Sequence, residues 1–297
     1  MAWRGLHLTQ PSRLTVADDQ IVVDQDDGEV RLAIEDVAWV VIDSPRTSLT
    51  ASLMSALMDK GVAVIFTDAT HTPSGVALPF HRHHRQADVL ARQIAASGPL
   101  KKRLWQYIVR QKIDNQAAVL EGTGAGGATT LRAMARRVGS GDPGNIEAQA
   151  ARYYWGKLWR DFRRDDPGDR RNMMLNYGYA VVRSGVARAL VATGLLPALG
   201  LKHASVSNAF NLADDLVEPF RPFVDALAWR TAGEGAPSRD DLSVEDRRAM
   251  AAVLLGDAEM GGGNLTLLVA AEHSAESLVR ALEAGTPAVL RLPVFKP

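Results

Sequence analysis

The spacing of apolar and polar residues changes character about 80 residues into the chain. Before that point, short apolar runs alternate with turn signals; the four runs are residues 20–24, 30–34, 37–42 and 62–66. The turn signal Asp26-Asp27-Gly28 predicts that the first two runs form a hairpin. The other two runs are continuously apolar, which predicts buried strands. Between them, Ser48 is a candidate N-cap for a helix that ends at Gly61.

From about residue 86 onward, the apolar residues recur at helical spacings. We interpret the glycine-rich segment 122–127 as a flexible connection between two helices. Asp142-Pro143 predicts the start of another helix. Further helices are predicted over about 172–192, over about 208–227, and through the last 60 residues around Gly261-Gly262-Gly263. The chain therefore predicts an α+β fold with a small β-rich domain (1–80), a linker (81–88) and a larger all-α domain (89–297).

Composition excludes several classes of protein. The 297 residues include no cysteine, which rules out disulfide frameworks, thiolate zinc sites and cysteine nucleophiles. A cysteine-free chain is typical of a reducing cytosol, so we expect a cytoplasmic protein. The first seven residues lack the apolar core of a signal peptide. The best candidate for a membrane span, residues 181–201, carries Arg183 and Arg188, so we expect no contact with a membrane.

A formal net charge of zero conceals a segregation of charge along the chain. Residues 1–81 hold 5 basic and 11 acidic side chains, whereas residues 82–137 hold 11 basic and 3 acidic ones. A local excess of eight positive charges indicates a surface for a polyanion. A solvated helix face, or a patch that complements the acidic first segment, explains the same excess.

Glu147 is the first candidate for chemistry. On a helix it shares a face with Ala151, Tyr154 and Leu158, so its carboxylate points toward the apolar side. A buried carboxylate is costly unless it meets a cation. The simplest interpretation is an ion pair with an inward-facing arginine; a catalytic role is the other.

A second candidate is the segment from His203 to Asp225. Its polar residues are spaced so that they line one helix face: Asn211, Asp215, Glu218, Pro222 and Asp225. An ordinary amphipathic helix has the same pattern. His203 lies fifteen residues before Glu218 and is able to approach that face from the preceding turn. One histidine and two carboxylates from separate helices form a nitrogen and oxygen site that suits Mg²⁺ or Mn²⁺.

Basic residues near such a site would place a phosphodiester beside the metal; they are Arg152, Arg163, Arg164 and Lys202. Two other features are weaker candidates for a functional site. The histidines at 81, 83 and 84 are more typical of a solvated linker than of a metal site. Trp105 and Tyr107 lie among Lys101, Lys102 and Arg103, where stacking on bases and anchoring in the core are both open.

Several motifs resemble the Cas1 family, the CRISPR-associated integrases that acquire spacers. The segments that carry the resemblance are 145–154, 175–180, 195–203 and 208–225. Trp3-Arg4 and residues 83–86 resemble the form of the family found in type II systems. The resemblance covers nearly the whole chain and is strongest from 145 to 225. It implies a fold with an N-terminal β domain and a C-terminal α-helical catalytic domain, which agrees with the pattern above.

The resemblance implies Glu147, His203 and Glu218 as the metal ligands, with Asp215 as a candidate to hold a ligand in place. It also implies a Mg²⁺- or Mn²⁺-dependent DNA endonuclease and integrase of CRISPR adaptation. Such an enzyme joins the free 3′-hydroxyls of a short duplex to the CRISPR repeat by transesterification. The implied partners are double-stranded DNA, a second copy of the chain, and Cas2 in a complex of four and two subunits.

Six basic residues are candidates for contacts with DNA: Lys101, Lys102, Arg103, Arg152, Arg163 and Lys202. Whether His203 also acts as an acid or base is open. Two alternatives to the integrase remain at this point. One is a metal-dependent repair nuclease that uses water as its nucleophile, and the other is a DNA-binding scaffold without catalysis.

Overall fold

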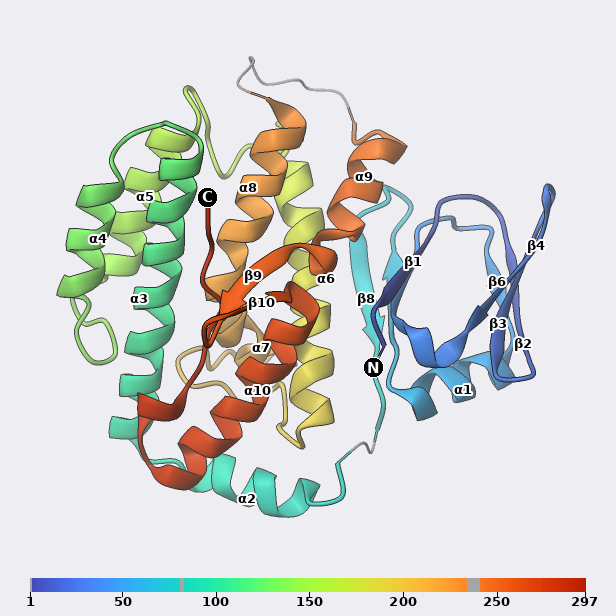
Figure 1. Cartoon of the computed structure of the whole chain (residues 1–297), viewed down its shortest axis with the longest axis horizontal. Coiled ribbons are helices and arrows are strands. Elements are labelled where there is room, and N and C mark those ends of the chain that lie inside the picture. The colour runs from blue at the N-terminus through green and yellow to red at the C-terminus, as the bar shows by residue number, and fades with distance from the viewer. Residues whose placement is uncertain (1, 81–82, 234–240) are drawn as a thin grey trace. The chain divides into compact units, whose positions relative to one another are not determined.

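The computed structural model describes residues 2–80, 83–233 and 241–297 (Figure 1). Contacts divide the chain into two compact units, Met1–His84 and Arg85–Pro297. This division falls inside the predicted linker, of which His81 and Arg82 lie outside the described residues. The domain boundaries at residues 80 and 89 stay predictions.

The described residues of the first unit form two four-stranded sheets and one α-helix. One sheet has the order β1 (Arg4–Leu8), β5 (Val37–Ile42), β7 (Ala63–Thr67) and β8 (Pro73–Ala77). Its first three strands run parallel and β8 runs antiparallel to β7. Every residue of β5 is buried, as its continuous apolar run predicts for a central strand.

The second sheet has the order β4 (Gly28–Ala33), β3 (Gln20–Gln25), β2 (Arg13–Ala17) and β6 (Ser48–Leu49). The antiparallel pairing of β3 with β4 confirms the predicted hairpin. Helix α1 (Ala51–Lys60) ends at Gly61, whose φ of 74° is the left-handed conformation that glycine favours. Its N-cap is Thr50, so the prediction of Ser48 was wrong. Ser48 instead pairs with Arg13 in β6, which moves the helix start two residues along the chain.

The second unit is mostly helical. Its helices are α2 (Gln86–Ala95), α3 (Gly98–Gly122), α4 (Ala128–Arg137), α5 (Ile146–Leu158), α6 (Arg170–Ala192), α7 (Asn211–Leu216), α8 (Arg221–Ala232), α9 (Val244–Ala251) and α10 (Leu267–Ala284). Short 3₁₀ turns occupy Glu218–Phe220, Val253–Leu255 and Pro287–Val289 in this unit, and Ile34–Asp36 in the first unit. The long helix α3 packs against α4, α5, α8 and the 218–220 turn, so it runs through the middle of this unit (Figure 1). The β-rich unit followed by a helical unit confirms the predicted fold class.

Two predictions for the second half of this unit were wrong. The region 208–227 is not one helix, because the 218–220 turn separates α7 from α8. Around Gly261-Gly262 the chain forms a hairpin of β9 (Asp257–Met260) and β10 (Gly263–Thr266) instead of helix. Both glycines have positive φ, which a tight hairpin turn requires. In the described part of the chain, no helix has the length and apolar character to cross a membrane.

Candidate active site

Glu147 lies in the first turn of α5. The carboxylate of Asp142 accepts the backbone N–H groups of Ile146 and Glu147, at 2.9 and 3.0 Å. Asp142 therefore satisfies amides at the helix start, but the N-cap is Asn145 and the helix begins at Ile146, so the predicted start at Asp142-Pro143 was wrong. Asp142 and Asn145 both have positive φ, 52° and 49°. The chain makes a turn between them, and this turn sets where the side chain of Glu147 emerges.

Glu218 lies where the polar segment bends. Pro219 and Pro222 have no N–H to continue an α-helical ladder, and the chain passes from α7 through a 3₁₀ turn into α8. Glu218 opens that turn and is buried, with 6% of its surface exposed. The break directs its carboxylate toward α3, the helix that packs on the turn.

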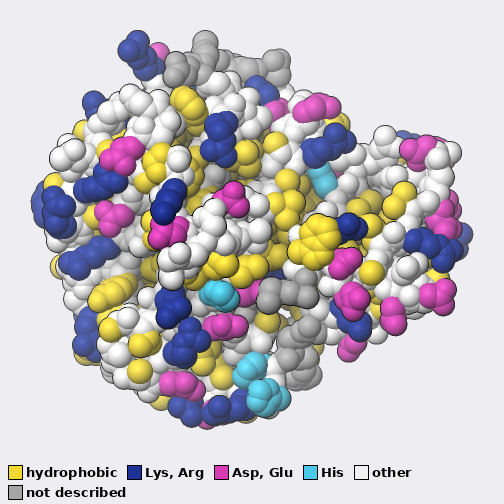
Figure 2. Space-filling view, viewed as in Figure 1, with side chains coloured by type: hydrophobic (Ala, Val, Ile, Leu, Met, Phe, Trp, Pro, Cys, Tyr) yellow, Lys and Arg dark blue, Asp and Glu magenta, His cyan; other side chains and the backbone are white. Residues whose placement is uncertain are grey.

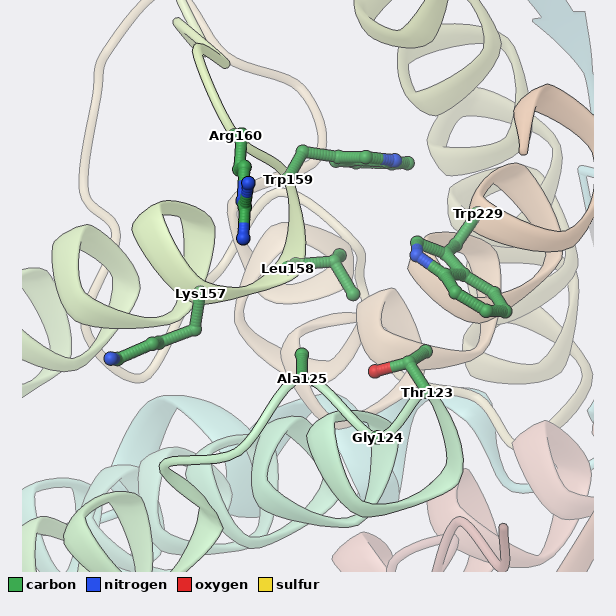
Figure 3. A pocket seen from close by; sticks show the side chains of 8 residues that line it. All are labelled: Thr123, Gly124, Ala125, Lys157, Leu158, Trp159, Arg160 and Trp229. Carbon is green, nitrogen blue, oxygen red and sulfur yellow. The ribbon is translucent and has the colours of Figure 1, made fainter. Parts of the chain in front are cut away.

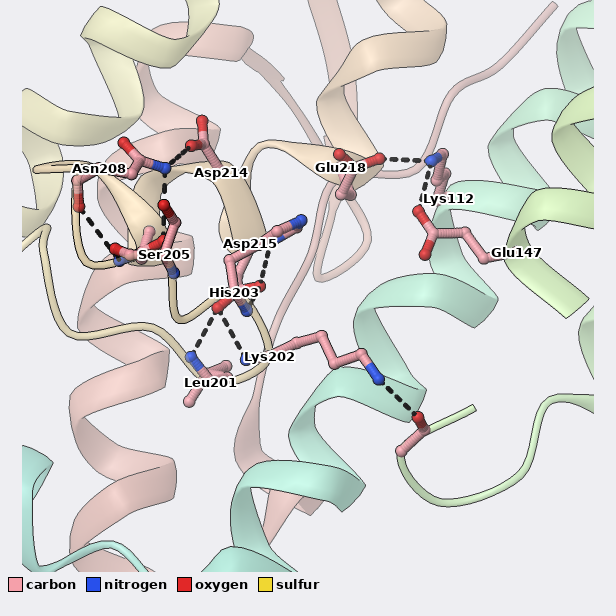
Figure 4. A network of polar contacts seen from close by, with 12 residues as sticks. Lys112, Glu147, Leu201, Lys202, His203, Ser205, Asn208, Asp214, Asp215 and Glu218 are labelled. Atoms are coloured by element: carbon pink, nitrogen blue, oxygen red, sulfur yellow. Dashed lines mark hydrogen bonds and ion pairs between the residues drawn. The ribbon is translucent and has the colours of Figure 1, made fainter. Parts of the chain in front are cut away.

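Lys112 of α3 joins the two glutamates. Its ammonium lies 2.7 Å from Oε1 of Glu147 and 2.5 Å from Oε2 of Glu218 (Figure 4). Burial lowers the pKa of Lys112, but the carboxylates of Glu218 and Glu147 outweigh it, so the pKa is raised. The inward carboxylate of Glu147 therefore meets a lysine, where the simplest interpretation of the sequence expected an arginine.

Arg221 occupies the other oxygen of Glu218. Its Nε donates to Oε1 of Glu218 at 2.8 Å. Burial alone would raise the pKa of Glu218, but Arg221 and Lys112 reverse that effect and lower it to about 2. Glu218 is therefore an anion at every physiological pH, as a metal ligand or an ion-pair partner must be.

His203 is held by Asp215. Nδ1 of the imidazole lies 2.7 Å from Oδ1 of Asp215, which is fully buried. The same carboxylate accepts the backbone N–H groups of Leu201, Lys202 and His203, at 2.5, 3.0 and 3.1 Å. The hydrogen bond to Asp215 raises the pKa of His203, although partial burial opposes it. Because Nδ1 is engaged, Nε2 is the nitrogen left to bind a metal or a substrate.

The donor set fits a hard divalent cation. Two carboxylates already converge on one positive charge, at the ammonium of Lys112. The third donor, His203, is oriented by a carboxylate, as metal-binding histidines commonly are. Among the described residues, however, no three His, Asp or Glu side chains are gathered closely enough to hold a metal as they stand. Glu147 and Glu218 are brought together through Lys112, and His203 is brought to Asp215.

The candidate DNA-contact residues differ in their surroundings. The side chain of Lys102 packs near Gly141, and Nζ of Lys202 lies 3.4 Å from the Gly141 carbonyl oxygen. Both lysines thus border the loop that leads into α5. Arg152 and Arg163 are exposed, whereas Arg103 donates to the Gly285 carbonyl. Figure 2 shows further Lys and Arg side chains over α4 and α5, at the left of the view.

Two cavities lie near these residues. One encloses about 150 Å³ beside Glu218, and its lining also includes Lys112, Gln116, Arg221 and Asp225. The other encloses about 480 Å³ at the ends of α3, α5 and α8 (Figure 3). Trp159, Arg160 and Trp229 line it. Of the three predicted metal ligands, Glu218 lines the smaller cavity and none lines the larger one.

Sequence reasoning missed Lys112. Its signal was present in the spacing, because Leu104, Ile108 and Lys112 recur every four residues along α3. The first two are fully buried, so a lysine at the next position of that stripe needs an anion. Trp105 is buried and Tyr107 is 40% exposed. This places Trp105 in the core, where its ring meets that of His203 edge-on at 5.7 Å.

Comparison with known proteins gives consistent matches. A family model described as CRISPR-associated protein Cas1 matches residues 6–260. The chain is 45% identical over 227 residues to the CRISPR-associated endonuclease Cas1 of Neisseria meningitidis serogroup C (strain 8013), a match that covers 76% of this chain and 74% of that protein.

Solved structures show the same fold. A casposase bound to its integration product has a TM-score of 0.77 at 19% identity, over 95% of this chain and 91% of that chain. A Cas6-RT-Cas1–Cas2 complex has a TM-score of 0.74 at 19% identity, over 97% of this chain. The match covers only 36% of that longer chain.

Proposed function

The chain belongs to the Cas1 family of CRISPR-associated proteins, the endonucleases and integrases of CRISPR adaptation, and we propose that its active site consists of Glu147, His203 and Glu218. The reaction is insertion of a short DNA duplex into a CRISPR array. The observation that carries this assignment is the convergence of Glu147 and Glu218, from two separate elements, on a single positive charge.

The residues fit transesterification. The 3′-oxygen of the incoming duplex forms a bond to phosphorus, the bond to the 3′-oxygen of the repeat breaks, and the proton of the attacking hydroxyl ends on the leaving oxygen. Mg²⁺ or Mn²⁺ bound by the two carboxylates and His203 would polarise the phosphoryl oxygen and acidify the attacking hydroxyl. Asp215 holds His203 in one orientation, and Arg221 keeps Glu218 ionised. With water in place of the 3′-hydroxyl, the same groups support hydrolysis.

The partners follow from family membership. One of the similar solved structures is a Cas1–Cas2 complex, and one is a casposase bound to DNA integration product. We propose that this chain likewise forms homodimers that Cas2 bridges, in a complex of four and two subunits. The duplex would contact Lys101, Lys102, Arg103, Arg152, Arg163 and Lys202. We assign the complex to the cytoplasm because the chain has no cysteine.

The test is strand transfer of a labelled short duplex into a supercoiled plasmid that carries a CRISPR repeat. The reaction is run with Mg²⁺ or Mn²⁺, with and without Cas2, and with a duplex that ends in a 3′-dideoxynucleotide. We expect joined label only with an intact 3′-hydroxyl. Glu147→Gln and Glu218→Gln should abolish joining, since each removes a negative charge from the site.

Glu272→Gln is the matched control, because Glu272 also pairs with a cation, Arg188, at 2.6 Å but on α10. It should retain joining. Metal-dependent nicking that ignores the 3′ end would favour the nuclease. DNA binding with no chemistry under either metal would favour the scaffold.

A further inference from the structure

The position on which the active-site carboxylates converge already holds a cation of the chain. Lys112 is 9% exposed, and its ammonium contacts one oxygen of Glu147 and one of Glu218. A divalent cation that binds between the same oxygens cannot share them with the ammonium. The lysine therefore has to leave before a metal can bind between these two oxygens.

The smaller cavity offers the ammonium a second position. Lys112 and Gln116 lie one helical turn apart on α3, and both line this cavity of about 150 Å³. Oε1 of Gln116 is buried and has no hydrogen-bond partner among the described residues. An unmade hydrogen bond at a buried acceptor is costly. Asp225 lines the same cavity, but its carboxyl already accepts the Tyr179 hydroxyl.

The cavity also holds positive charge, from Arg164 and Arg221. Arg221 is already engaged with Glu218, and Arg164 donates to Asn172 and Asn176, at 3.1 and 2.7 Å. These pairings direct both guanidinium groups toward other acceptors. Gln116 therefore remains as an acceptor for a moved lysine.

We propose that Lys112 is an internal counter-cation that competes with the catalytic metal, bridging Glu147 and Glu218 in the metal-free protein and turning toward Gln116 in the cavity when metal binds. This inference rests on the proposed metal site. Lys112 is thus a positioning residue that sets the affinity for metal. If the bridged state holds nine-tenths of the metal-free molecules, Lys112 weakens metal binding about tenfold.

The experiment is a titration of the full-length protein with Mn²⁺, in which the electron paramagnetic resonance signal of free Mn²⁺ reports the dissociation constant. Lys112→Met keeps an unbranched side chain, one heavy atom shorter, and removes its charge. We expect it to bind Mn²⁺ about tenfold more tightly than the unaltered protein. Its melting temperature should also rise more on adding Mn²⁺, because tighter binding stabilises the folded state further.

Lys296→Met is the control, since the exposed ammonium of Lys296 also pairs with a glutamate, Glu259 of β9, at 2.7 Å. It should leave the dissociation constant unchanged. Gln116→Leu is a second variant in which the bridge is intact but the second acceptor is removed, and it should bind Mn²⁺ several-fold more weakly.

Equal or weaker Mn²⁺ binding by Lys112→Met, with measurable binding by the unaltered protein, would overturn the inference and leave the proposed function intact. If Lys112→Met does not fold, unchanged affinity in Gln116→Leu overturns it in the same way. If the unaltered protein does not bind Mn²⁺, and Glu147→Gln and Glu218→Gln leave strand transfer unchanged, both the proposed metal site and the inference are overturned.

Discussion

Asp215 fixes both the ring and the backbone of His203. One oxygen of its buried carboxylate lies 2.7 Å from Nδ1 and 3.1 Å from the backbone nitrogen of the same residue. The other oxygen accepts two more amides of the 201–203 loop. A single carboxylate thus determines where the imidazole stands and leaves Nε2 as the ring nitrogen that it does not engage.

Asp215→Asn should impair both roles. An amide has one accepting oxygen and presents N–H groups to backbone donors, so part of the loop loses its partner. Loss of such supporting groups lowers metal affinity or activity by about 10- to 100-fold. Mn²⁺ titration and strand transfer measure the two effects. Asp214→Asn is the control, because Asp214 bonds Arg183 on the other side of the helix start. Equal losses in both variants would contradict this role.

Gly200 is required for the same loop to close. A Cβ there would lie 2.2 Å from the His203 carbonyl oxygen and 2.9 Å from Oδ2 of Asp215. Gly200→Ala should therefore displace the loop, destabilise the protein by about 1–3 kcal/mol and reduce strand transfer. Urea denaturation measures the first effect.

Gly156→Ala makes a contrasting pair. Gly156 lies within α5, and a Cβ there meets no atom within 4 Å. Because alanine favours helix over glycine, stability should rise by roughly 0.5–1 kcal/mol. If Gly200→Ala and Gly156→Ala change the unfolding free energy by similar amounts, the protein relieves the crowding at Gly200 without loss of stability.

Asp225 should make stability depend on pH. Burial raises its pKa from 3.8 to about 7, although the hydrogen bond from the Tyr179 hydroxyl opposes the shift. Between about pH 4 and 7 the folded protein keeps a proton that the unfolded chain releases. The contribution of Asp225 to stability is therefore lost as the pH rises through this range.

Asp225→Asn should remove that loss. The difference in unfolding free energy between the variant and the unaltered protein should shift in favour of the variant by up to about 4 kcal/mol from pH 4 to pH 8. Urea midpoints at the two pH values test this, with the exposed Asp257→Asn as control. A difference that does not vary with pH would show that Asp225 ionises normally in the folded state.

Charge reversal in the basic segment should weaken DNA binding. Replacing Lys101, Lys102 and Arg103 by glutamate should lower affinity for a short duplex. The slope of log affinity against log salt should fall by about one for each phosphate that the variant no longer neutralises. Mn²⁺ binding should stay unchanged. Arg280→Glu, on the exposed face of α10, serves as control, and an unaltered salt slope in the triple variant would exclude this surface.

Local sequence patterns predicted those helices and strands whose formation depends on residues within the element itself. The hairpin at Asp26-Asp27-Gly28 and the strand 37–42 are examples, since turn chemistry and continuous burial both leave a mark on the sequence. The helix break at Glu218 was missed because α7 and α8 share one amphipathic pattern across it. The hairpin at Gly261-Gly262 was missed because its strands have only four residues each.

For the candidate site, too, the sequence predicted some residues and missed others. Motifs and spacing singled out Glu147, His203 and Glu218, and the family membership is confirmed. The pairing of Lys112 with two carboxylates joins residues 35 and 106 positions apart, so no local window contains it. Such contacts arise from the packing of α3 against α5 and the 218–220 turn, which depends on the whole helical unit.

The paired glutamates carry a consequence for the order of assembly. Lys112 and Arg221 together cancel the two negative charges of Glu147 and Glu218. A DNA backbone that approaches the metal-free protein therefore meets no net repulsion from this cluster. At the proposed site, the charges of these four residues therefore impose no order on the binding of DNA and metal.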